Sequence, residues 1–202
     1  MDHQSMQYAQ TDATLLARLF TEARSQNGWL DQPVPPELLQ HVHELARMGP
    51  TSMNCSPLRI LYLTSQEAKE RLRPALAAGN VDKMMTCPVV AIFATDFEFA
   101  EHLPFLFPHT DGKGFFERNT HLVADTAFRN ATLQAAYYML AARAVGLDCG
   151  PISGFNAAAV DGIFFAGTQT KSNFICGIGH GDPSKLFPRH PRFAFDDVCT
   201  VL

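Results

Sequence analysis

The run Pro88-Val-Val-Ala-Ile-Phe-Ala94 decides the fold, because it is short, begins with a proline and is almost wholly apolar. Its Val, Ile and Phe residues are the types that favour a β-strand. A strand without alternating polar residues is typical of one that is covered on both faces. The run therefore predicts a central strand of a buried sheet.

Helical and strand patterns surround this run at irregular intervals. Apolar residues that recur every three or four positions predict helices, and branched residues predict strands. The helical segments are 12–23, 37–48 and 121–145, and strand composition returns at 59–63 and 173–178. The middle of the longest helix, 131–144, is apolar nearly all round, as in a core or interface helix. Helix dominates and the alternation is irregular, so we expect one domain of α+β class with a single sheet wrapped by helices.

Two segments have no clear period. Residues 1–11 are polar and predict a flexible N-terminus without the charged start and apolar core of a signal peptide. Residues 97–116 contain six phenylalanines, interrupted by Pro104, Pro108 and Gly112. This segment predicts a long apolar loop, which is either a lid over a binding site or a loop that packs on the core or on a second subunit.

The composition excludes several classes of protein. The 202 residues carry a net charge of −4, and only 18% of them are charged, whereas the average is roughly 25%. A second copy of the chain that covers part of the surface would explain this shortage. The acidic balance argues against a nucleic-acid partner, and no apolar run approaches the roughly 18 residues of a membrane-spanning helix. The five cysteines form no C-x-x-C pair, which is typical of a reduced compartment, so we expect a cytoplasmic protein.

Common catalytic motifs are weak in this sequence. Gly177-Ile-Gly-His-Gly181 is similar to the start of a dinucleotide-binding fingerprint, but its last glycine comes one position early and Asp182-Pro183 follows instead of a helix. A glycine-rich turn is therefore the better interpretation. The histidines lack the spacing of a metal site, so we expect no metal. Cys55 lies in a polar turn and is either a nucleophile or an inert packed thiol.

A scattered set of residues suits an anionic, planar cofactor. Arginine side chains bind phosphate through paired, charge-assisted hydrogen bonds. The turns at 50–54 and 79–83 offer backbone groups, amides and one lysine, which the edge of a heteroaromatic ring requires. Each residue taken singly is also typical of a turn, a helix cap or a solvated charge. The cations in question are Arg24, Lys185, Arg189 and Arg192.

Four motifs in a fixed order connect these residues. They are Arg24-Ser25 with Trp29, Gly-Pro-Thr-Ser-Met-Asn-Cys-Ser-Pro at 49–57, Asn80-x-x-Lys83, and Ala-x-Gly-Leu-Asp-Cys-Gly-Pro-Ile-Ser-Gly-Phe at 144–155. In this order the chain resembles the FMN-dependent nitroreductase family from about residue 20 to its C-terminus. Within the family, segments such as Ser-Gln-Asn-Gly-Trp at 25–29 and Gly-Asp-Pro-Ser-Lys-Leu-Phe at 181–187 are similar to malonic semialdehyde reductases of pyrimidine degradation.

The resemblance implies a nitroreductase-like fold with a central, mainly antiparallel sheet, in an intertwined homodimer that holds FMN at the subunit interface. It also implies a role for each matching residue. The phosphate would be bound by Arg24, Ser25, Arg189 and Arg192, with Lys185 as an alternative. Pro50, Thr51, Ser52 and Asn54 would lie against the isoalloxazine ring from the partner subunit. Asn80 and Lys83 would face the pyrimidine edge of the ring, and the backbone at Ile152, Ser153 and Gly154 would approach flavin N5.

Two positions depart from the family pattern. Ser153 stands where many members carry an acidic residue, and Asn27 stands where a second arginine or lysine commonly precedes Trp29. We expect Asn27 to remain in the cofactor site while the C-terminal arginines bind more of the phosphate.

The function that the resemblance implies is flavin-dependent reduction by NAD(P)H in a ping-pong reaction, with Lys83, Ser153 and Gly154 as the catalytic residues. The implied substrate is malonic semialdehyde, which would be reduced to 3-hydroxypropionate. Two alternatives remain open: a reductase of broad specificity for nitroaromatics and quinones, and a non-catalytic flavin-binding protein.

Overall fold

The computed structural model describes residues 12–202, and the segment 1–11, for which the sequence predicts a flexible N-terminus, lies outside them. The strands are β1 (Leu58–Leu63), β2 (Val89–Asp96), β3 (Asp148–Ile152) and β4 (Thr170–Gly179). The α-helices are α1 (Ala13–Leu16), α2 (Pro36–Ala46), α3 (Gln66–Leu72), α4 (Val81–Met85), α5 (Leu103–Leu106), α6 (Gly112–Arg118), α7 (Val123–Ala144), α8 (Ala157–Phe164) and α9 (Phe195–Val198). In this described part of the chain, no helix has the length and apolar character needed to cross a bilayer.

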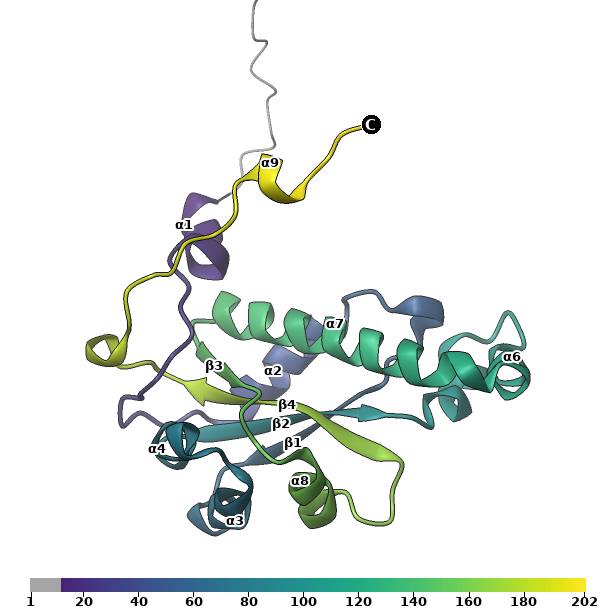
Figure 1. The fold of residues 1–202 in the computed structure, drawn as a ribbon, viewed down its shortest axis with the longest axis horizontal. Helices are drawn as coiled ribbons and strands as arrows, with labels where there is room; N and C mark the ends of the chain where they lie inside the picture. The colour runs from purple at the N-terminus through teal and green to yellow at the C-terminus, as the bar shows by residue number, and fades with distance from the viewer. Residues whose placement is uncertain (1–11) are drawn as a thin grey trace, which may run out of the picture.

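An antiparallel sheet in the order β1-β2-β4-β3 forms the middle layer (Figure 1). Strand β2 contains the run that predicts a central strand, and it is buried along its whole length. Its side chains alternate, so that Ala91 and Phe93 pack toward α2 and α7, while Val90 and Ile92 pack toward α3, α4 and α8. These two core clusters confirm the predicted α+β fold with a mainly antiparallel sheet covered on both faces.

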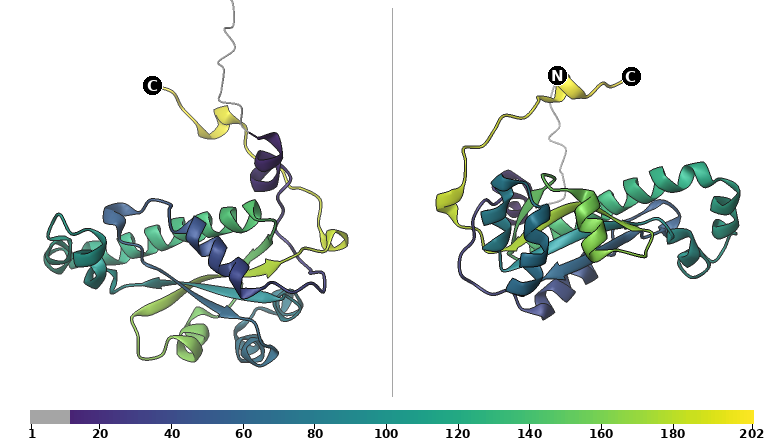
Figure 2. Two further views of the ribbon diagram at one scale, coloured as in Figure 1. Left: turned by 180° about the vertical axis from the view of Figure 1, so that it is seen from behind. Right: turned by 60° about the horizontal axis from the view of Figure 1, so that its bottom comes forward.

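The long helix α7 crosses one face of the sheet beside α2 (Figures 1 and 2). Small residues on its buried stripe let it approach the sheet closely, and Tyr138 fills the remaining space by packing edge-on to Phe93 with ring centroids 5.3 Å apart. On its other side, Phe128 and Leu133 are exposed. The helix ends before Gly146, whose φ of +90° is readily adopted only by glycine. One face of α7 therefore builds the core while another is left uncovered.

The segment 97–116 is not the loop that the sequence predicts. It forms a short 3₁₀ turn followed by α5 and α6, and its buried Phe99, Leu103 and Phe116 pack with Cys55 in a third core cluster. The prediction was wrong because Pro104, which suggests a break, lies in the first turn of α5, where proline is tolerated. Asp111 then caps α6 by accepting a hydrogen bond from the Gly114 amide. The buried residues of this segment pack on the core, which is one of the two predicted alternatives. Whether the segment also acts as a lid over the binding site stays a prediction.

The chain after β4 leaves the body of the domain, passes α1 and ends beyond α9 (Figures 1 and 2). Large apolar side chains are exposed along it, and Phe193 and Val201 are 80% and 85% accessible. The others are Phe187, Phe195, Val198 and Leu202. A series of exposed apolar residues is typical of a surface that packs on another molecule.

Candidate functional site

The site lies along β3, which is an edge strand of the sheet. Residues 24–29, which follow α1 and the helical turn after it, run beside this strand. Ser25 forms a parallel bridge to Cys149, and the Gln26 amide donates to the Cys149 carbonyl at 3.0 Å. Trp29 pairs with Gly181 beyond the end of β4. These backbone contacts fix residues 24–29 against the sheet, although Ser25 and its bridge partner Cys149 are 124 positions apart in the sequence.

Four arginines from three segments surround one cavity of about 550 Å³. The Arg24 guanidinium donates to the Phe187 carbonyl, and Arg189 Nη2 donates to the carbonyls of Thr21 and Ala23 at 2.8 and 3.0 Å. Within residues 12–202, no carboxylate lines the cavity and none of its arginines forms an ion pair. Such a concentration of unneutralised positive charge suits a phosphate group. The lining includes Arg24, Ser25, Asn27, Arg143, Arg189 and Arg192.

The structure thus brings together the predicted phosphate-binding residues except Lys185. The side chain of Lys185 packs over Gly28, where an added Cβ would lie 2.6 Å from Lys185 Cγ. Lys185 does not line the arginine cavity. Of the two predicted alternatives at the C-terminus, the structure places Arg189 and Arg192 at the cavity.

Lys83 belongs to α4 and packs beside β3, and only 9% of its surface is exposed. Its aliphatic stem packs over Gly150, where a Cβ would lie 2.9 Å from Lys83 Cε. Burial lowers the pKa of the Lys83 ammonium, and the neighbouring Cys176 and Cys87 raise it less. Among the described residues the ammonium has no ion-pair partner. A buried cation without an anion is costly in the free protein, so the group is suited to a ligand that carries negative charge.

Beyond Lys83, Asn80 and Gly154 are in direct contact. Asn80 Nδ2 donates to the Gly154 carbonyl at 3.0 Å, and the Ala77 amide donates to the same oxygen at 3.0 Å. A side chain at Gly154 would collide with Asn80, since an added Cβ would lie 2.6 Å from Nδ2. Ser153 is exposed, whereas the Ile152 side chain is buried in the core, so only the main chain of Ile152 can face a ligand.

The loop at Pro50–Asn54 is not part of this arrangement within one chain. It packs along α7, where the Ser52 amide donates to Asn130 Oδ1 at 2.8 Å and Tyr137 donates to the Pro50 carbonyl at 3.1 Å. Asn130 and Arg143 are 13 positions apart on the helix, which corresponds to roughly 20 Å. If the loop contributes to the site at β3, it does so from a second subunit, as the resemblance implies.

Three features of the site were missed from the sequence. Gln26 is buried, and its Oε1 has no hydrogen-bond partner among the described residues. Gly150 leaves the space that Lys83 and Trp29 occupy. Arg143 lines the arginine cavity, and its signal was available, because it is the single charged residue of the apolar stretch 131–145.

The other motifs have structural roles. Gly177 makes room for the Trp29 ring, Gly179 for Pro88 and Gly181 for Gln26, so the glycine-rich segment is not a dinucleotide loop. Cys55 is buried, and burial raises its pKa to about 11, which leaves almost no thiolate at neutral pH. The nucleophile alternative for Cys55 is therefore wrong. No cluster of potential metal ligands occurs in residues 12–202.

The fold and this site define an α+β protein with a cationic cavity joined along an edge strand to a buried lysine. The chain belongs to the nitroreductase family, whose model matches residues 21–180. It is 58% identical over 189 residues to a Ralstonia pickettii protein named NADH dehydrogenase/NAD(P)H nitroreductase HadB, a match that covers 92% of this chain and 96% of the relative. A Cupriavidus pinatubonensis protein of the same descriptive name is 55% identical over 190 residues, with 93% and 97% covered.

Solved structures share the fold at lower sequence identity. A Bacillus subtilis nitroreductase, ydfN, superimposes with a TM-score of 0.85 and 24% identity, covering 95% of this chain and all of its own. A nitroreductase from Exiguobacterium sibiricum in complex with FMN gives a TM-score of 0.79 and 20% identity, with 95% and 98% covered. The nitroreductase-like fold expected from the sequence is confirmed.

Proposed function

We propose that this protein, an NAD(P)H-dependent oxidoreductase of the nitroreductase family, binds FMN along β3 and reduces malonic semialdehyde to 3-hydroxypropionate. The observation that supports the cofactor assignment is the order along β3, in which the four-arginine cavity lies beside Ser25, Lys83 packs over Gly150 and Asn80 bonds to Gly154. The substrate assignment rests on the segments similar to malonic semialdehyde reductases, 25–29 and 181–187 above all.

The residues present fit a flavin mononucleotide. The arginine cavity suits its phosphate dianion, because the described lining residues offer guanidinium donors and no carboxylate. The buried Gln26 Oε1 has no hydrogen-bond partner in the described part of the chain, and a hydroxyl group could supply one. Among residues 12–202, the ammonium of the largely buried Lys83 has no ion-pair partner. A cofactor with a phosphate, a polyol chain and a ring edge that accepts hydrogen bonds satisfies all three.

Bound flavin supplies the hydride chemistry, and the protein tunes it. The Lys83 ammonium would supply positive charge at N1 and the C2 carbonyl, where reduction leaves negative charge. Asn80 Nδ2 is held by its hydrogen bond to the Gly154 carbonyl, and the Asn80 amide oxygen and second N–H would bind the same ring edge. The main chain at Ser153 and Gly154, with no acidic side chain at 153, would approach N5.

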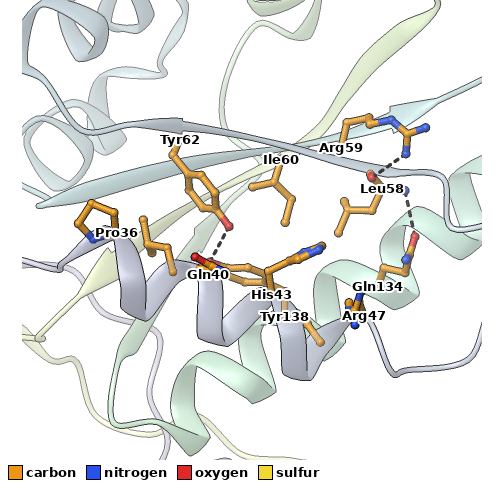
Figure 3. A pocket seen from close by; sticks show the side chains of 12 residues that line it. Pro36, Gln40, His43, Arg47, Leu58, Arg59, Ile60, Tyr62, Gln134 and Tyr138 are labelled. Carbon is orange, nitrogen blue, oxygen red and sulfur yellow. Dashed lines mark hydrogen bonds between the residues drawn. The ribbon is translucent and has the colours of Figure 1, made fainter.

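A second copy of the chain completes this site in our proposal. A groove of about 460 Å³ lies between the edge strand β1 and α2, and Gln134 and Tyr138 of α7 also line it (Figure 3). Its floor includes Leu58, Ile60 and Tyr62, which alternate along β1 toward α2, and the Tyr62 hydroxyl is 2.9 Å from the Tyr138 hydroxyl. The outer edge of β1 has no neighbouring strand among the described residues. An edge strand beside an apolar groove is suited to an added extended segment.

The partner's C-terminal tail is the occupant that we propose for this groove. The tail of each subunit points away from its own domain and exposes apolar side chains along its length (Figure 2). Exchange of tails would bury these residues and the groove together, and the uncovered face of α7 would pack in the same interface. The arrangement would bring Pro50–Asn54 of one subunit to the β3 site of the other, as the family resemblance implies.

The competing activity is the reduction of nitroaromatics or quinones, which the name of the Ralstonia pickettii relative favours. Enzyme reduced anaerobically with NADH should be reoxidised by malonic semialdehyde with a kcat/KM at least tenfold above that for a nitroaromatic acid, and 3-hydroxypropionate should form stoichiometrically. The opposite ratio assigns the broad nitroreductase activity instead. Flavin that NADH leaves oxidised would indicate the non-catalytic alternative.

A further inference from the structure

Arg143 lines the arginine cavity from the last turn of α7. Its Nη1 donates to the Leu19 carbonyl at 3.1 Å, and its side chain is partly buried. A guanidinium has five N–H donors, so one hydrogen bond leaves donors for a ligand in the cavity. The C-terminal end of α7 also carries the negative end of the helix dipole, which would repel a bound anion without a nearby cation.

Asn27 lines the same cavity without contributing charge. The family pattern commonly has an arginine or lysine at this position, so the chain lacks a cation on that side. Arg143 supplies one from a different element, and no carboxylate of residues 12–202 lines the cavity to neutralise it.

We propose that Arg143 binds the phosphate group of FMN and replaces the positive charge that Asn27 does not provide. This inference rests on the proposed function, because it requires that the protein binds FMN. It makes Arg143 a phosphate-binding residue in addition to Arg24, Arg189 and Arg192.

The test compares FMN with riboflavin, which has the same ring and ribityl chain but no phosphate, by titrating the apoprotein and following flavin fluorescence. R143Q removes the charge and keeps hydrogen-bond donors, so it should weaken FMN binding about 10- to 100-fold, the range of a charge-assisted hydrogen bond. The affinity of R143Q for riboflavin should stay within about twofold of the wild-type value. This result would also show that the variant is folded. Adding N27R to R143Q should recover at least tenfold in FMN affinity.

Arg18 offers a matched control. It also bonds to the end of α7, where Nη1 donates to the Ala144 carbonyl at 3.3 Å, but it does not line the arginine cavity. R18Q should therefore leave the preference for FMN over riboflavin unchanged.

Two outcomes separate this inference from the proposed function. If the wild-type protein prefers FMN and R143Q keeps that preference, because it weakens both flavins equally or neither, the inference is overturned while the cofactor assignment stands. If the wild-type protein binds neither flavin, both are overturned.

Discussion

Removal of residues 193–202 should convert the proposed dimer into a monomer and weaken FMN binding more than 100-fold. The deletion leaves Arg189 and Arg192 in place, so the loss would come from the missing subunit contact. The deleted stretch carries five exposed large apolar residues, and burying each fully contributes roughly 1.5–3 kcal/mol. Two exchanged tails would therefore contribute on the order of 10 kcal/mol or more to association. Sedimentation velocity at micromolar concentration, with and without FMN, measures the outcome.

The matched control for the deletion is a full-length protein with Asp196→Ser and Thr200→Ser, two polar tail positions that would add little to the contact. This variant should stay dimeric and yellow. A truncated protein that remains a dimer and keeps its FMN affinity would contradict the exchange of tails and the role of the partner's loop.

Replacement of Lys83 by methionine should lower the two-electron reduction potential of the bound flavin. A preorganised charged contact contributes on the order of 1–3 kcal/mol, which for two electrons corresponds to roughly 20–65 mV. The same substitution should not lower the stability of the apoprotein. Burial lowers the pKa of Lys83, which means that the free folded state disfavours its charge. Lys83→Met removes that cost, so the free energy of unfolding of the apoprotein should rise or stay constant.

Lys69 offers the control for this substitution, because it is equally buried but its ammonium donates to the Cys87 carbonyl at 2.6 Å. Lys69→Met should destabilise the protein by leaving that carbonyl unpaired, and should leave the flavin potential unchanged. Dye equilibration measures the potentials, and urea unfolding measures the stabilities. A Lys83→Met protein with an unchanged potential and unchanged FMN affinity would remove Lys83 from the cofactor site.

Local pattern was sufficient for the main elements of the fold. The apolar run at 88–94 predicted a strand buried on both faces, and the periodicity at 121–145 predicted α7, because both signals arise within a single element. The segment 97–116 was misread because its prolines and glycines suggest breaks, whereas Pro104 and Gly112 lie in the first turns of helices. The cluster around Phe99 depends on contacts with Cys55 and Ala127, which spacing along the chain does not report.

In the site, too, sequence motifs identified some residues, whereas the roles of others depend on contacts between distant parts of the chain. Motifs in the family order named Arg24, Lys83 and Asn80, and the fold places them along one strand. Gln26 was missed because its role comes from a neighbour more than 100 residues away, Gly181. Arg143 stands out in the sequence as the single charge in 131–145, but its place beside Leu19 and the arginine cavity follows only from the fold. The place of Pro50–Asn54 could not follow from one chain, since the proposed contact belongs to a second.

The direct test of the cofactor site is a titration of dimeric apoprotein with FMN and then with riboflavin. We expect one FMN per subunit, bound at least 100-fold more tightly than riboflavin, and a yellow complex that NADH bleaches in the absence of oxygen. A dimer that takes up no FMN, or that binds both flavins with equal affinity, would contradict the assignment of the arginine cavity to the phosphate.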